Sequence, residues 1–214
     1  MGKANITDTS KAAASNTHSV KPKPIYDFVK RVFDIVCSLI GLIVLSPVFI
    51  IISILIKTTS EGPVFFAHKR VGKDGKTIKI YKFRSMVTNA EELIKQFTPE
   101  QKAEYEKNFK LENDPRVTKV GKFMRKTSLD ELPQLINILK GDISVVGPRP
   151  VMDVETKIYG NYRDMLLSVK PGLTGFWAAN GRSATTYTRR RAMEIYYVKN
   201  RSVLLDLKII FKTF

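Results

Sequence analysis

The amino-acid sequence predicts an α+β protein, and three patterns support that class. A predominantly apolar run, free of charged residues, extends from 35 to 56. Two short alternating stretches around Lys73-Asp74-Gly75 follow it, and Asp-Gly between such stretches is a strong β-hairpin signal. Helical periodicity then returns after Pro133 and again towards the C-terminus. Helices and one short hairpin in separate parts of the chain indicate α+β rather than α/β architecture.

Composition narrows the choice of partners. The 214 residues carry a formal net charge of +16, which favours anionic partners such as nucleic acid, anionic lipid or phosphorylated substrates. The single cysteine, Cys37, excludes an intramolecular disulfide. Only His18 and His68 are present, far apart in the chain, which argues against a histidine-rich transition-metal site. A bound metal is therefore expected to be a hard cation such as Mg²⁺, held by oxygen ligands.

Residues 1–24 are expected to form a disordered tail. They are rich in Ser, Thr, Ala, Asn, Lys and Pro, and they bury too little apolar surface to offset chain entropy. They do not read as a signal peptide, because the apolar run begins too late and no cleavage site of small residues follows it. We expect a membrane segment over 25–58 and a cytoplasmic domain over 59–214.

The apolar run has two interpretations. As a straight helix it would be about 33 Å long, enough to cross a bilayer. However, Pro47 in its interior removes one backbone hydrogen bond and clashes with the carbonyl of Ile43, which favours a kink. Ser46 can donate to a carbonyl one turn earlier and deepen the bend. A helix broken at Ser46-Pro47 would enter and leave the membrane on the same side.

The flanking charges favour this re-entrant interpretation, although a span stays open. Basic flanks lie on the cytoplasmic side of a membrane, and both flanks of this run are basic. A re-entrant helix satisfies both flanks at once. The residues concerned are Lys21, Lys23, Lys30 and Arg31 before the run, and Lys57, Lys69, Arg70, Lys73 and Lys76 after it.

The rest of the chain predicts short elements. Residues 62–86 form the hairpin, and its second strand ends with Lys82 and Arg84, which could face a phosphate. Residues 88–111 predict two charged helices divided near Thr98-Pro99. Residues 189–214 predict two amphipathic helices, and the apolar face of the second packs in the core or lies at the membrane interface. That face consists of Leu204, Leu207, Ile210, Phe211 and Phe214.

The stretch 127–150 is the most informative part of the sequence. Two adjacent acids, Asp130 and Glu131, come just before a helix, close to Arg125. Acids at a helix start beside basic residues indicate a place where phosphate and a divalent ion meet. The alternative is structural, because Ser128 and Glu131 also match a capping box. The predicted buried face of the helix is Leu132, Leu135, Ile136 and Leu139.

Six short motifs follow one another in a fixed order. In that order they closely resemble the bacterial sugar transferases, the monotopic phosphoglycosyl transferases in their small, minimal-domain form. The likeness covers 28–214, and its specificity comes from the order rather than from any one motif. The motifs are Ser46-Pro47, YKFRSM at 81–86, DPR at 114–116, RKTSLDELPQ at 125–134, GPRP at 147–150 and KPGLTG at 170–175.

The resemblance implies a reaction at the cytoplasmic face of the bacterial cell membrane. Such enzymes transfer a sugar phosphate from a UDP-sugar to undecaprenyl phosphate, release UMP and begin a surface glycan such as exopolysaccharide or capsule. By the resemblance, Asp130 is the nucleophile that forms a phosphosugar intermediate, and Glu131 ligates Mg²⁺.

Further residues are candidates for substrate binding. Arg125 and Arg149 can bind phosphate oxygens bidentately. Lys82 and Arg149 are assigned to the nucleotide phosphates or the uridine. Arg84 and Pro148 are further candidate substrate-binding residues. Asp142 is either a further acidic contributor or a turn-forming residue.

A membrane-anchored binder of nucleic acid or anionic lipid is the alternative function. It would show steep salt dependence and no dependence on Asp130. The sequence favours the enzyme, without a nucleic-acid partner, because the basic residues are spread over several turns and form no continuous stripe with stacking aromatics. The sugar and the oligomeric state, including a homodimer, stay open. Residues 174–190 are candidate selectors of the sugar.

Overall fold

The structure is a computed structural model that describes residues 20–213, apart from 109–110, 112 and 182–184. Residues 1–19 of the predicted tail lie outside the described residues, as do parts of the segment expected to select the sugar. The chain divides into two compact units, which are described separately. The acidic-pair unit comprises Lys30–Arg70 and Thr77–Val145, and the C-terminal unit comprises Met1–Val29, Val71–Lys76 and Val146–Phe214.

Short helices and small strands make up both units, as the predicted α+β class requires. The two predicted helices of 88–111 are present as α3 and α4, divided at Thr98-Pro99. Outside the C-terminal unit, the elements in chain order are α1 (Pro24–Val44, which begins in that unit), α2 (Ser46–Thr59), β1 (Phe65–Val71), β2 (Thr77–Phe83), α3 (Ala90–Ile94), α4 (Pro99–Asn108), α5 (Lys119–Thr127), the 3₁₀ turn η2 (Leu129–Glu131), α6 (Gln134–Lys140) and β3 (Ser144–Val146).

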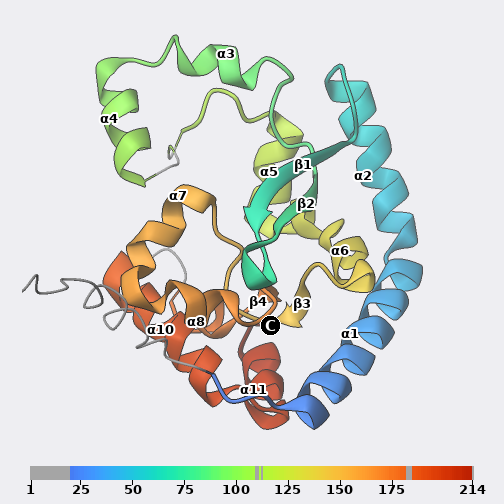
Figure 1. Ribbon diagram of the computed structural model, residues 1–214. Helices are drawn as coiled ribbons and strands as arrows, with labels where there is room; N and C mark the ends of the chain where they lie inside the picture. Colours follow the sequence, from blue (N-terminus) through green and yellow to red (C-terminus); the bar gives the residue numbers. More distant parts are fainter. Residues whose placement is uncertain (1–19, 109–110, 112, 182–184, 214) are drawn as a thin grey trace, which may run out of the picture. The chain divides into compact units, whose positions relative to one another are not determined.

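The apolar run is broken at the predicted position. Figure 1 shows α1 and α2, blue to cyan, as two consecutive helices separated by a bend, and the angle between them is 60°. The hydroxyl of Ser46 donates to the carbonyl of Ile43 at 2.8 Å, as expected for a serine beside a proline kink. Within the described residues no single helix is long and apolar enough to cross a membrane, and α1 and α2 meet that requirement only as a bent pair.

One face of α2 packs against the hairpin and α5. Ile52 and Ile56 of α2 are buried with Phe83 of β2 and Met124 of α5. The Phe83 ring also lies 5.2 Å from Phe49 and 5.3 Å from Phe65, between ring centroids. The hairpin turn has the predicted form, since Asp74 and Gly75 both have positive φ, at 57° and 76°. The core therefore fixes β2, the strand that contains Lys82.

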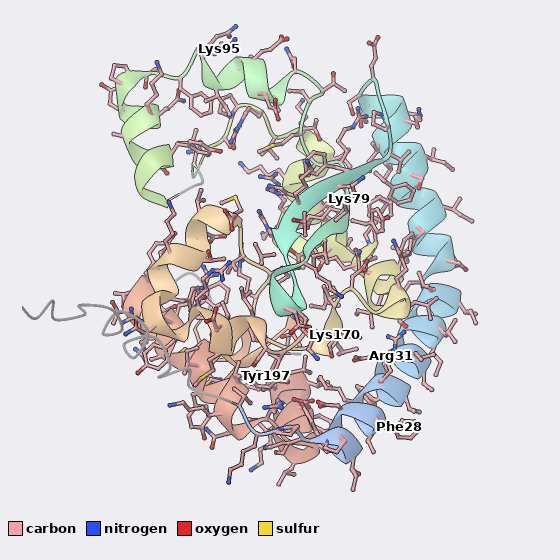
Figure 2. The ribbon with its side chains drawn as sticks, viewed as in Figure 1. Phe28, Arg31, Lys79, Lys95, Lys170 and Tyr197 are labelled. Carbon is pink, nitrogen blue, oxygen red and sulfur yellow. The ribbon has the colours of Figure 1, made fainter. Side chains whose placement is uncertain are left out.

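Helix α1 is hydrogen-bonded to the segment that follows the acidic pair. Arg31, labelled in Figure 2, donates from its two Nη atoms to the carbonyl oxygens of Ile138 and Leu139, at 2.7 and 2.8 Å. These carbonyls lie in the last turn of α6, where helical carbonyls lack their usual partners, and that of Ile138 also accepts from the N–H of Gly141 at 3.0 Å. The buried carboxylate of Asp34 accepts from the Ser144 hydroxyl and from the Val145 N–H, each at 2.9 Å. Two polar side chains of α1 thus hold both ends of the α6–β3 connection.

The predicted buried face of α6 is correct only in part, because Leu132 packs against the core but is only partly buried. The buried residues of this helix are Gln134, Asn137 and Ile138, whereas Ile136 is exposed. Leu135 packs beside Gly41 of α1. The apolar repeat did not indicate Asn137, whose polar side chain is buried because it finds hydrogen-bond partners inside the unit.

In the C-terminal unit, short helices contact the two longer helices at 187–200 and 203–213. The buried hydroxyl of Tyr197 (labelled in Figure 2) donates to Asp206 at 2.8 Å, and the hydroxyl of Tyr26 donates to the same carboxylate at 2.9 Å. The two predicted C-terminal helices are both present. The elements of this unit are η1 (Lys73–Gly75), α7 (Asp153–Thr156), η3 (Lys157–Tyr162), α8 (Arg163–Leu167), β4 (Gly172–Thr174), α9 (Phe176–Ala179), α10 (Tyr187–Asn200) and α11 (Val203–Thr213).

Candidate active site

The acidic pair lies in a tight turn between two helices. Helix α5 ends at Thr127, the next residue Ser128 has a left-handed backbone with φ of 58°, and Asp130 and Glu131 occupy the 3₁₀ turn that follows. The side chain of Ser128 makes no capping hydrogen bond, so the capping-box interpretation is wrong. The turn places the two acids directly ahead of α6, as predicted.

Lys82 joins the two acids from the neighbouring strand. Its Nζ lies 2.6 Å from Oε1 of Glu131 and 3.8 Å from Oδ2 of Asp130. Lys82 belongs to β2, so this cluster is assembled from two distant parts of the sequence. One ammonium thus lies within ion-pair distance of two carboxylates.

The two acids differ in burial. Asp130 is buried, while the side chain of Glu131 is 37% exposed. Burial raises the pKa of Asp130 above its ordinary value, and the charge of Glu131 adds to that rise, whereas Lys82 and Arg125 oppose it. A partly desolvated carboxylate beside an exposed one offers one group for chemistry and another for binding an ion.

Arg125 lies in the last turn of α5, one turn before the acidic pair. Its Nε donates to the hydroxyl of Ser85 at 2.9 Å, and its side chain stays exposed. Helix α5 reaches this position because Gly121 packs directly against the backbone of Ser85, where any side chain would overlap the Ser85 carbonyl oxygen. Arg125 and Lys82 thus bring two cations to Asp130 from different elements.

Arg84 has partners other than the predicted phosphate. It is buried, and its Nη2 donates to the carbonyl oxygen and the hydroxyl of Ser60, both at 2.9 Å. Its Nη1 donates to the carbonyl of Glu61. These groups follow the C-terminus of α2, where helical carbonyls lack partners. Burial lowers the pKa of the guanidinium. We therefore leave Arg84 out of the residues on which the proposal below depends.

Asp142 is joined to α6 rather than to the acidic pair. Its Oδ2 accepts a hydrogen bond from Nδ2 of Asn137 at 3.0 Å and lies 3.8 Å from Nζ of Lys140. It follows Gly141, which ends α6 with a φ of 87°. The turn-forming interpretation of Asp142 describes this position.

Sequence reasoning missed a buried ion pair close to the site. Asp114 accepts two hydrogen bonds from the Arg116 side chain, at 2.8 Å to Nε and 2.6 Å to Nη2. The guanidinium also lies over the rings of Phe97 and Tyr105, at 5.1 and 5.0 Å. This pair therefore anchors α4 and the segment between α3 and α4. The DPR motif could have indicated this ion pair, because an aspartate two residues before an arginine can accept two hydrogen bonds from the guanidinium.

Pro148 and Arg149 belong to the C-terminal unit. The N–H of Arg149 donates to Oε1 of Glu194 at 3.1 Å, and its guanidinium lies 5.6 Å from the centre of the Trp177 ring. Arg190 lies over the same ring at 4.8 Å. Burial raises the pKa of Glu194 to about 7, against the opposing effect of Arg149 and Arg190. A shallow pocket beside this turn is lined by Pro148, Arg149, Val71, Leu166 and Pro171.

The donor set near Asp130 fits Mg²⁺ bound together with a phosphorylated substrate. Among the residues that the structure describes, no three or more His, Cys, Asp or Glu side chains are grouped to hold a metal by themselves. Mg²⁺ is commonly bound by one or two carboxylates plus substrate phosphates. Glu131 is exposed enough to offer such a ligand once Lys82 releases it.

Comparison with known proteins identifies the family. The model of the family described as bacterial sugar transferase matches residues 25–214. Undecaprenyl-phosphate galactose phosphotransferase of Salmonella typhimurium is 50% identical over 189 residues, covering 87% of this chain and 40% of that protein. The exopolysaccharide production protein ExoY of Sinorhizobium fredii is 44% identical over 194 residues, covering 89% of this chain and 86% of that protein.

A third relative is UDP-glucose:undecaprenyl-phosphate glucose-1-phosphate transferase of Escherichia coli, 40% identical over 207 residues. The match covers 89% of this chain and 42% of that protein. The chain thus spans less than half of two of these relatives and most of ExoY. The family match extends over nearly all of the chain, as the six motifs predicted. The chain belongs to the bacterial sugar transferase family.

Proposed function

We propose that this protein transfers a sugar phosphate from a UDP-sugar to undecaprenyl phosphate, with release of UMP. The names of the Salmonella and E. coli relatives support the acceptor and the class of donor. The observation that carries the proposal is the buried carboxylate of Asp130 beside Lys82, with the more exposed Glu131 next to it. The product would begin a surface polysaccharide, in line with the name of the ExoY relative.

The chemistry proceeds in two displacements at phosphorus. A carboxylate oxygen of Asp130 attacks the phosphate attached to the sugar, and the bond to the UMP oxygen breaks, so UMP leaves with the electron pair. An oxygen of undecaprenyl phosphate then attacks the same phosphorus and releases the Asp130 carboxylate. Desolvation of Asp130 by burial favours this role, because a poorly hydrated carboxylate gives up less solvation when it attacks.

The cations around Asp130 make the attack on an anion feasible. Lys82 opposes the rise that burial causes in the pKa of Asp130, and it can move to a phosphate oxygen when substrate arrives. Arg125, anchored by Ser85, can bind a second phosphate oxygen. Glu131, with Asp130 beside it, would hold Mg²⁺, which when bound supplies positive charge to the phosphate oxygens. Arg149 and Pro148 are the proposed nucleotide contacts of the C-terminal unit.

The bent helix pair is the proposed membrane attachment. Many apolar side chains on α1 and α2 are exposed, and Phe28 (labelled in Figure 2), Ile43, Ile50 and Ile54 are each more than half exposed. Exposed apolar residues on a kinked pair, with basic residues on both sides, support a re-entrant anchor at the cytoplasmic face of the membrane. On α11, Leu204 and Phe211 are also exposed, which supports an interfacial position for that helix.

Cysteine labelling tests the re-entrant arrangement. We expect Lys21→Cys and Lys76→Cys, each in a Cys37→Ser background, to be inaccessible to a membrane-impermeant maleimide in intact cells. Both should react after the cells are opened, because both flanks lie inside. Labelling of the Lys21→Cys variant from outside would instead show that the segment spans the bilayer.

A donor panel tests the reaction itself. The wild-type protein in detergent, with Mg²⁺ and undecaprenyl phosphate, should release UMP from one or more UDP-sugars. Removal of Mg²⁺ with EDTA should stop the release. A protein that releases no UMP from any UDP-sugar, but binds anionic vesicles with a steep salt dependence, would support the membrane-anchored basic binder instead.

A further inference from the structure

One buried amide on α6 stands out among the residues that the proposed reaction does not use. Asn137 is completely buried, on the helix that begins three residues after Glu131. Its Oδ1 accepts from the N–H of Tyr81 at 2.9 Å, and its Nδ2 donates to the carbonyl of Lys79 at 2.7 Å. Lys79 is labelled on the hairpin in Figure 2. A helix is therefore hydrogen-bonded to a strand through one side chain.

The amide takes the place of a neighbouring strand. Strand β2 pairs with β1 in a two-stranded sheet, so its other edge has backbone groups without a strand partner. Tyr81 and Lys79 lie two residues apart, and their N–H and C=O face the same edge. A primary amide presents one acceptor and one donor side by side, which matches this pair. Loss of the amide would leave two backbone groups without these partners, in a buried place.

Asp142 fixes the orientation of this amide. Its Oδ2 accepts from Nδ2 of Asn137 at 3.0 Å, and its own N–H donates to the backbone carbonyl of Asn137 at 3.0 Å. A carboxylate beside the amide nitrogen leaves the amide oxygen to face Tyr81. The orientation of the Asn137 amide, which bridges α6 and β2, is thus set by three polar partners: Tyr81, Lys79 and Asp142.

The bridge and the acidic pair contact the same strand at adjacent residues. Lys82 follows Tyr81 directly, and its Nζ lies 2.6 Å from Glu131 and 3.8 Å from Asp130. The acidic pair and Asn137 also lie on one continuous segment, from η2 into α6. Asn137 therefore fixes how far β2 stands from that segment, and with it the reach of Lys82.

We propose that Asn137 is a positioning residue, which holds Lys82 in register with Asp130 and Glu131 through β2. This role rests on the proposed transfer reaction. A shift of about 1 Å in a catalytic group can lower a rate by about 10²-fold. We therefore expect Asn137→Ser to lower kcat for UMP release by about 10²-fold.

A double-mutant cycle separates positioning from a general loss of structure. If Asn137 acts through Lys82, Asn137→Ser should lower kcat only a few-fold, roughly, in a Lys82→Met background, because the group that it positions is absent. Ile138→Val is the matched control, since Ile138 is the next residue of α6 and equally buried. Its effect should be the same in both backgrounds. Equal factors for Asn137→Ser in both backgrounds would overturn the positioning role.

Hydrogen exchange supplies a readout that is independent of activity. In the Asn137→Ser variant the amide of Tyr81 should exchange faster, whereas the amide of Arg84, which donates to the carbonyl of Val64 at 2.8 Å, should stay protected. Equal acceleration at both amides would show general unfolding and overturn the local role. Wild-type protein that releases no UMP would instead overturn the proposed reaction and the positioning role together.

Discussion

Replacement of Asp130 by Asn is expected to abolish turnover and leave the fold intact. The amide has nearly the same shape as the carboxylate but is a poor nucleophile towards phosphorus, so UMP release should fall by about 10⁴-fold or more. Burial disfavours the charged form of Asp130, as its raised pKa indicates, so the neutral amide removes a desolvation cost. Lys82 keeps Glu131 as a partner at 2.6 Å. The midpoint of thermal unfolding should therefore not fall.

Intact-mass measurement identifies the intermediate directly. Wild-type protein incubated with its UDP-sugar and Mg²⁺, without acceptor lipid, should gain the mass of one sugar phosphate, and Asp130→Asn should gain none. Asp164→Asn is the control, because it removes a carboxylate whose side chain is 74% exposed and should leave both the adduct and the turnover unchanged. An adduct on the Asp130→Asn variant would place the nucleophile elsewhere.

Breakage of the Asp114–Arg116 pair is expected to cause a large loss of stability. Both side chains are almost fully buried, at 6% and 7% exposed. Arg116→Met leaves Asp114 as a buried charge without its partner and removes the contacts of the guanidinium with Phe97 and Tyr105. The free energy of unfolding should fall by about 3–5 kcal/mol. Arg163→Met breaks an exposed pair with side chains 44% and 74% exposed, and should change it by less than about 1 kcal/mol.

The pH dependence of this loss gives its cause. Burial alone would raise the pKa of Asp114, but hydrogen bonds from the Arg116 side chain and N–H hold that pKa below its ordinary value. In the wild type, the contribution of ionised Asp114 to the free energy of unfolding is therefore present above the unfolded pKa of about 3.9 and is lost only in stronger acid. In Arg116→Met the pKa of Asp114 rises, so the deficit should be larger at pH 8 than at pH 5. Denaturant titrations in detergent at both pH values measure it, and a deficit independent of pH would contradict this account.

Local chemistry predicted much of the fold. The break at Ser46-Pro47 follows from the missing N–H of proline, and the hairpin turn follows from the ease with which Asp74 and Gly75 adopt positive φ. The acidic pair was placed correctly ahead of α6, because Pro133 favours a helix start. Each of these features depends on neighbours in sequence.

The features that sequence reasoning missed depend on partners far along the chain. Asn137 was passed over because its hydrogen-bond partners, Tyr81 and Lys79, lie more than 50 residues away. Arg31 and Arg84 were taken as a membrane flank and a phosphate ligand. In the structure they satisfy carbonyls at the ends of α6 and α2. The last carbonyls of a helix need hydrogen-bond donors from elsewhere, and a sequence does not say which arginine supplies them.

The contact between Gly121 and Ser85 restricts how this protein can be engineered. No side chain fits at 121, since even a methyl group would overlap the Ser85 carbonyl. Displacement of the backbone to make room would also disturb the hydrogen bond between Arg125 and Ser85. A mutant library that aims to change the donor sugar would lose most members if it varied this position. Gly121 and Ser85 are best kept constant, so that diversity is concentrated in residues 174–190 of the C-terminal unit.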